Sequence, residues 1–139
     1  MVISYFISVS GFEPKTAKKG KEMTVRKKEL RNEFEAQNDN LEEIRNNCRD
    51  KKLSIDVGFY LYAGIKKNVT RYKKDLDNML KIVLDVLKEK MDDNQQERGL
   101  EIIRNNEDDM VYEINCRKKL VEIKSQEGID VRISEHIAV

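Results

Sequence analysis

Two aspartates and a lysine with spacing suited to metal-assisted chemistry lie within the segment YKKDLDNMLKIVLDVL. Asp75 and Asp77 are two residues apart, and Lys81 follows Asp77 by four, which places Asp77 and Lys81 on one face of a helix. Mg²⁺ prefers oxygen ligands and keeps several waters, so one to three carboxylates are enough to hold it. Such an ion can polarise a phosphodiester oxygen and lower the pKa of a bound water, while Lys81 would offset charge that develops on the phosphate.

The same three residues also have a purely structural interpretation. Asp75 can cap a helix, Asp77 is favourable in a first turn, and Lys81 can pair with Asp77. Composition and spacing leave both interpretations open.

Two amphipathic helices are predicted, and the first turn of the second one carries the acids. Its range is residues 76–91, and its apolar side is formed by Leu76, Met79, Leu80, Val83, Leu87 and Met91. The other helix runs from a cap at Thr24 to about residue 49, with a polar middle at residues 37–40 that can bend or fray. Its apolar stripe is Leu30, Phe34, Leu41, Ile44 and Cys48.

Alternating apolar residues predict strands at residues 2–10, 53–62, 110–117, 120–124 and 129–133. In the second strand Leu53, Ile55, Val57, Phe59 and Leu61 share one face; in the third, Met110, Tyr112, Ile114 and Cys116 do. A turn is expected at Glu127-Gly128 between the last two strands. The prediction is a single α+β domain over residues 1–139, a mixed β-sheet with two main helices packed on it, in the order β-α-β-α-β-β-β.

The charges are segregated although the net charge is only +1. Residues 15–31 hold eight Lys/Arg against two Glu, and residues 66–74 hold five Lys/Arg and no acid. Residues 92–109 are acidic. Basic stretches beside an acidic cluster suit a phosphate-binding surface around a metal site, whereas the simpler interpretation is a set of solvated faces.

Composition excludes several classes of protein. Apolar residues make up 39% of the chain and are clustered, so a folded protein is expected although 38% is charged. Two distant cysteines, Cys48 and Cys116, give neither a zinc pattern nor a disulfide framework. The single histidine, His136, excludes a histidine-based triad. The absence of a signal peptide or a membrane-length apolar run favours a cytoplasmic protein.

The segment D-L-D-N-x-L-K-x-x-x-D-x-L resembles the signature of the RusA family of Holliday-junction resolvases. Asp75, Asp77, Asn78, Lys81 and Asp85 each occupy a matching position. The resemblance covers roughly residues 57–133 and implies a RusA-like fold. It also implies that the two aspartates, the lysine and a later aspartate from an acid pair form the active site.

The later aspartate has three candidate positions. In the family the acid pair directly precedes a strand that ends in a basic residue, and Glu107-Asp108-Asp109 before MVYEINCRK fits this arrangement. Alignment of that strand without a gap selects Asp108, whereas the literal Asp-Asp pair selects Asp109. The pair Asp92-Asp93 ranks last, because it ends a helix and no strand pattern follows it.

The function implied is Mg²⁺-dependent (Mn²⁺ possible) endonucleolytic cleavage of branched DNA by a homodimer. Asp75, Asp77 and Asp108 or Asp109 would bind the metal, and Lys81 would assist at the scissile phosphate. The candidate phosphate contacts are Lys15, Lys18, Lys19, Lys21, Lys66, Lys67, Arg71, Lys73 and Lys74.

Two departures from the family favour a second hypothesis. Gly11-Phe12-Glu13-Pro14 and a lysine-rich loop replace a Pro-rich, Asn-containing loop, and the span before the acid pair is about a dozen residues longer than in typical members. A non-catalytic DNA-binding or interaction protein on the same scaffold is therefore the alternative. A nucleotide-sugar enzyme using Asp75-Leu76-Asp77 is disfavoured, because the chain has no room for the larger domain that such enzymes use.

Overall fold

The computed structural model describes residues 4–17, 20–62, 75–92, 97–104 and 110–137. The described residues form a four-stranded mixed sheet in the order β1-β4-β2-β3, from β1 (Ser4–Ser10), β2 (Leu53–Tyr62), β3 (Val111–Val121) and β4 (Gly128–Glu135). β4 lies between β1 and β2 and is antiparallel to both, whereas β3 is parallel to β2. The chain is therefore α+β with a mixed sheet, as its sequence predicts.

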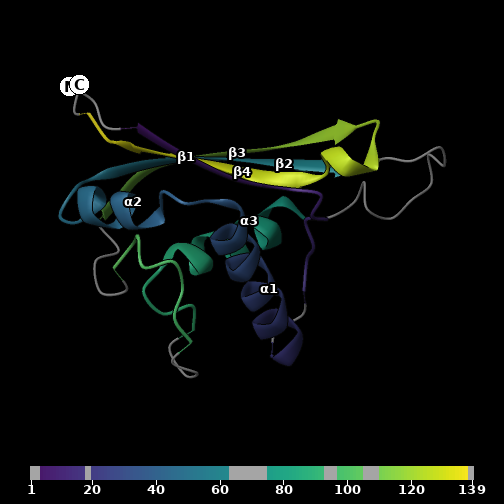
Figure 1. Ribbon diagram of the computed structural model, residues 1–139, viewed down its shortest axis with the longest axis horizontal. Helices are drawn as coiled ribbons and strands as arrows, with labels where there is room; N and C mark the ends of the chain where they lie inside the picture. The colour runs from purple at the N-terminus through teal and green to yellow at the C-terminus, as the bar shows by residue number, and fades with distance from the viewer. Residues whose placement is uncertain (1–3, 18–19, 63–74, 93–96, 105–109, 138–139) are drawn as a thin grey trace.

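The helices α1 (Lys21–Gln37), α2 (Leu41–Cys48) and α3 (Leu76–Leu87) lie on one side of this sheet (Figure 1). α3 joins the parallel strands β2 and β3, so its first turn follows the end of β2 in the chain. Within the described ranges, every helix is too short or too polar to cross a membrane.

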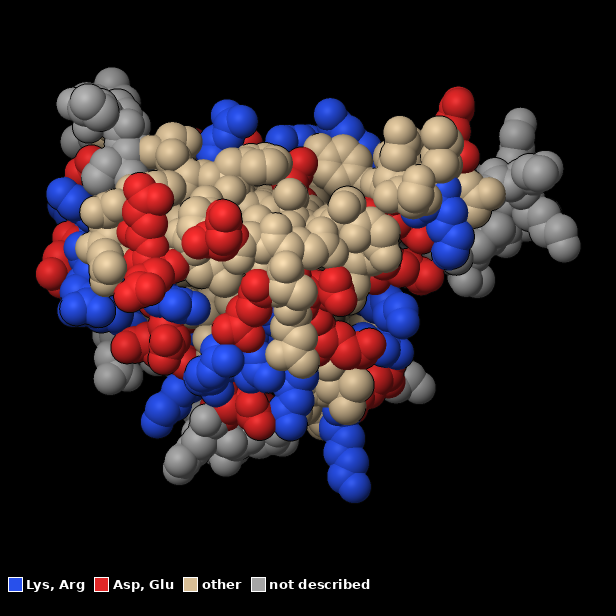
Figure 2. Space-filling model, viewed as in Figure 1, with Lys and Arg blue, Asp and Glu red and all other residues tan. Residues whose placement is uncertain are grey.

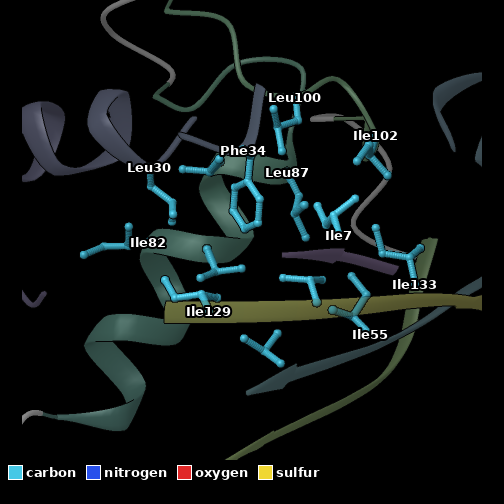
Figure 3. Packing of buried hydrophobic residues seen from close by; sticks show 14 of the residues in the cluster. Ile7, Leu30, Phe34, Ile55, Ile82, Leu87, Leu100, Ile102, Ile129 and Ile133 are labelled. Carbon is cyan, nitrogen blue, oxygen red and sulfur yellow. The ribbon is translucent and has the colours of Figure 1, made fainter. Parts of the chain in front are cut away.

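The core fills the space between the helices and the sheet. The alternating residues of β2, from Leu53 to Leu61, are all at most 1% exposed, as the period-two pattern predicts. The predicted helical stripe of Leu30, Phe34, Leu41, Ile44 and Cys48 is also fully buried. Figure 3 shows Phe34 and Leu30 of α1 and Leu87 of α3 facing the isoleucines of β1, β2 and β4. These two patterns fix which faces are inside.

The single long helix predicted to begin at Thr24 is two helices, α1 and α2, and the first begins at Lys21. α1 begins after Gly20, whose φ of 97° is a conformation that favours glycine, and Thr24 instead donates its hydroxyl to the carbonyl of Gly20. The helix breaks at residues 38–40, within the polar middle where a bend was predicted, because Asn38 and Asn40 bond to the backbone of β1. α3 likewise ends at Leu87 rather than at Met91.

The predicted strand order at the C-terminal end is wrong. Residues 110–117 and 120–124 do not form two strands, because Val111–Val121 is one continuous strand. A short 3₁₀ helix, Lys124–Gln126, then leads to β4. β3 and β4 do not pair across a Glu127-Gly128 turn, since β2 lies between them. The predicted apolar face of the strand at 110–117 is covered only in part, because Met110 is 4% exposed whereas Tyr112 is 50% and Ile114 42% exposed. Cys116 is partly buried and packs against the core.

Candidate active site

Asp75 is the N-cap of α3. Its Oδ1 accepts the backbone N–H of Asp77 at 3.0 Å, and its carbonyl accepts the N–H of Met79 at 3.1 Å. The prediction that Asp75 caps a helix is therefore confirmed. The residue is also exposed, and a carboxylate can accept more than one hydrogen bond or ligand.

Asp77 and Lys81 lie on the exposed side of α3, as their spacing predicts. The expected ion pair between them is absent from the described part of the structure, where neither side chain has a salt bridge. Both line a surface hollow of about 380 Å³ that follows α3 toward Lys88. Its other lining residues are Leu80, Leu84, Asp85, Ile103, Val111 and Ile114. An acid and an amine that form no ion pair with any described residue thus open onto one hollow.

Asp85 matches the RusA pattern in sequence, but it is occupied by two lysines. Its Oδ2 lies 2.9 Å from the amine of Lys27 and its Oδ1 lies 3.2 Å from that of Lys88. Lys27 is 6% exposed and also donates to the carbonyl of Met91 at 3.3 Å. The pair therefore ties α1 to α3 in the interior. Lys27 falls at helical spacing between Met23 and Leu30, a signal in the sequence that marks its burial.

Asn78 joins the acidic helix to the lysine-rich loop. Its Oδ1 accepts the N–H of Ala17 at 3.0 Å, and its Nδ2 donates to the carbonyl of the same residue at 3.2 Å. Lys15 in this loop lines a small hollow together with Met79 of α3. Sequence reasoning placed Asn78 in a motif but gave it no role. The structure shows that Asn78, the residue after Asp77, holds the backbone of Ala17 against α3.

Among the described cations of the basic stretch at residues 15–31, four in α1 are paired with acids. In α1, Arg26 binds Glu29 at 2.7 Å, while Lys28 and Arg31 reach Glu97 at 3.1 and 3.0 Å. Hydrogen bonds from Arg31 and then Lys28 lower the pKa of Glu97. Figure 2 shows basic and acidic side chains interleaved over the helical side of the molecule. Lys15 and Lys21 are exposed and have no ion pair within the described ranges, so they are the cations that remain for an anionic ligand.

Several predicted site residues lie outside the described residues. These are Lys18, Lys19, Lys66, Lys67, Arg71, Lys73, Lys74, Asp93, Asp108 and Asp109. Asp92 is described and half-buried. The strand that follows the acid pair begins at Val111, which lines the same hollow as Asp77 and Lys81.

The residues at the start of α3 fit Mg²⁺ by the chemistry of their donors. Asp75 and Asp77 offer exposed carboxylate oxygens, which are the ligands that this ion prefers, and it needs few of them because it keeps its waters. Among the described residues no group of three or more His, Cys, Asp or Glu could hold a metal ion. A complete three-carboxylate site would therefore need an acid from outside the described ranges.

The sequence matches no family model and no curated protein. The arrangement of residues around α3 is thus the basis on which a function is proposed.

Proposed function

We propose that this protein is a Mg²⁺-dependent, structure-selective DNA endonuclease that cleaves four-way junctions in the manner of the RusA family. The observation that carries the proposal is the pair of hydrogen bonds between the Asn78 side chain and the Ala17 backbone. These bonds hold Ala17, in the segment predicted as a lysine-rich loop, against a helix that begins with two exposed carboxylates. A phosphate-binding loop next to candidate metal ligands is what phosphodiester hydrolysis needs.

Each residue at the start of α3 has a distinct proposed role. Asp75 and Asp77 would hold the metal, with Asp75 kept in place by its cap hydrogen bond to the N–H of Asp77. When bound, the metal would supply polarisation of the scissile phosphate and a water of lowered pKa. The amine of Lys81, which has no ion pair among the described residues, would stabilise negative charge on the phosphate. Lys15 and Lys21, with the predicted cations outside the described ranges, would bind the DNA backbone.

We also propose that the protein acts as a homodimer. Cutting two strands of a symmetric junction requires two active sites related by a two-fold axis.

The test is cleavage of a labelled, mobile four-way junction with Mg²⁺ or Mn²⁺. Wild type is compared with Asp77→Asn, which keeps the shape of the side chain but removes its charge. Asp39→Asn is the matched control, because Asp39 is an exposed aspartate between α1 and α2. Paired symmetric nicks from wild type and from the control, lost by at least about a hundredfold in Asp77→Asn, would support the proposal.

The third acid is identified by the same assay. Asp108→Asn and Asp109→Asn are compared separately, and the residue that binds the metal is the one whose substitution abolishes cleavage without weakening junction binding in Ca²⁺. Tight junction binding without cleavage by wild type would instead favour a non-catalytic junction-binding protein. The absence of both binding and cleavage would mean that Asp75 and Asp77 only begin a helix.

A further inference from the structure

The two edge strands of the sheet differ in whether their outward backbone groups have hydrogen-bond partners. An edge strand presents N–H and C=O groups without ladder partners, and natural proteins usually cover or block them. β1 is one edge and β3 is the other.

The outer edge of β1 is closed by side chains from the turn between α1 and α2. Asn38 accepts from the N–H of Ser8 at 3.1 Å and donates to its carbonyl at 2.8 Å. Gln37 does the same for Ser10 at 2.9 and 3.1 Å. Asn40 donates to the carbonyl of Phe6 at 3.3 Å. Three amide side chains thus take the place of a further strand, so β1 is blocked against pairing.

The outer edge of β3 has no such cover among the described residues. All of its residues except Val111, Cys116 and Val121 are exposed. Three of the large exposed apolar side chains of the protein, Tyr112, Ile114 and Leu120, belong to this strand. An exposed eleven-residue edge with apolar side chains is suited to pairing with another strand.

The charges of β3 are arranged so that opposite charges lie at equal distances on either side of its central residue, Cys116. Glu113 lies three positions before Cys116, and Lys119 lies three positions after it. Glu113, beside Ser54, and Lys119, beside Tyr60, share the sheet face that the helices leave open. Neither side chain has an ion pair within the described part of the chain.

We propose that a second copy of this chain pairs antiparallel with β3, with the two-fold axis at Cys116, to form a continuous eight-stranded sheet. A two-fold axis perpendicular to the sheet leaves the helix-covered face of both copies on the same side. It also places each of the eleven residues of β3 opposite a residue of the other copy's β3. Glu113 then faces Lys119 of the other copy twice, once on each side of the axis. The helices of both copies lie on the same side of the joined sheet. The interface would supply the two-fold relation that the proposed junction cleavage needs, although the edge of β3 is open whether or not the protein cleaves DNA.

Cys116 gives a direct test, because the axis would place it opposite its own copy. Directly opposed antiparallel residues have Cα atoms about 4.5–5.5 Å apart, within the range that a disulfide spans. Mild oxidation with copper phenanthroline should give a reducible covalent dimer from wild type and from Cys48→Ser, but none from Cys116→Ser. Cys48 is 2% exposed and serves as the control thiol.

Charge reversal tests the register without any thiol chemistry. Glu113→Lys and Lys119→Glu should each weaken the dimer by roughly tenfold in sedimentation velocity, because each places like charges opposite one another twice. The double variant should recover the affinity of wild type, whereas Glu43→Lys, at an exposed position on α2, should have no effect. A monomer of 16.3 kDa at all protein concentrations, or a dimer that neither reversal changes and that Cys116 does not cross-link, would overturn the interface. Because DNA takes no part in these measurements, that result would leave the cleavage experiment to decide the activity on its own.

Discussion

Asn78 in the first part of α3 holds Ala17 in the lysine-rich loop through both groups of its side-chain amide, at 3.0 and 3.2 Å, across 61 residues of sequence. The contact holds the backbone of Ala17 against the helix that begins after Asp75. Asn78 therefore positions the backbone of Ala17.

Removal of the Asn78 amide should loosen the loop without disturbing α3. Asn78→Ala is expected to lose about 1–3 kcal/mol in the free energy of unfolding, because two hydrogen bonds are broken. Trypsin should cut faster at Lys15 in the folded protein, since the loop is no longer held. Limited proteolysis beside urea denaturation measures both effects. An unchanged cleavage rate at Lys15 would show that other contacts fix the loop.

The cap and the proposed ligand functions of Asp75 can be separated. Asp75→Ala should lower the free energy of unfolding by about 1 kcal/mol, whereas Asp75→Ser should keep most of the stability because serine also caps helices. Neither variant should cleave junctions, because both lack the carboxylate. Urea denaturation without metal gives the first result, and the junction assay gives the second. Full activity in Asp75→Ser would leave Asp75 with the cap role alone.

The buried ion pair between Lys27 and Asp85 should be costly to break from one side. Asp85→Leu leaves the Lys27 amine in the interior with the Met91 carbonyl as its remaining partner, and a loss of about 3–5 kcal/mol is expected. The double variant Lys27→Met/Asp85→Leu should recover most of this loss, since no charge is then buried. Chemical denaturation of both variants measures the difference. Lys88→Met is the control and should change stability by less than about 1 kcal/mol, because Lys88 is partly exposed.

Burial raises the pKa of the Cys48 thiol to about 11. The folded state therefore favours the neutral thiol, while the unfolded chain ionises it at lower pH. The contribution of this thiol to stability is complete below about pH 9, its ordinary pKa, and is lost as the pH rises toward 11, by about 2–3 kcal/mol in all. Cys48→Ala should show a shallower decline over that range in urea titrations at several pH values. A decline of equal slope in the variant would assign the pH dependence to other groups.

Local pattern alone determined which faces of the main elements are buried. The alternation from Leu53 to Leu61 and the stripe from Leu30 to Cys48 were predicted correctly, because each residue's face follows from a period of 2.0 or 3.6. The acids at the start of a helix were also correctly placed, since Asp75 is a strong capping residue.

Only the tertiary structure decided how these elements are joined. The break between α1 and α2 depends on Asn38 reaching Ser8, thirty residues away, and no local pattern contains that contact. The position of β2 between β3 and β4 results from long-range pairing, and it left β3 at an edge where alternation predicted a core face. The spacing of apolar residues shows which face of a helix or strand can be buried. Which other element covers that face depends on contacts between residues far apart in sequence. The loop that Asn78 holds and the open edge of β3 both became visible for that reason.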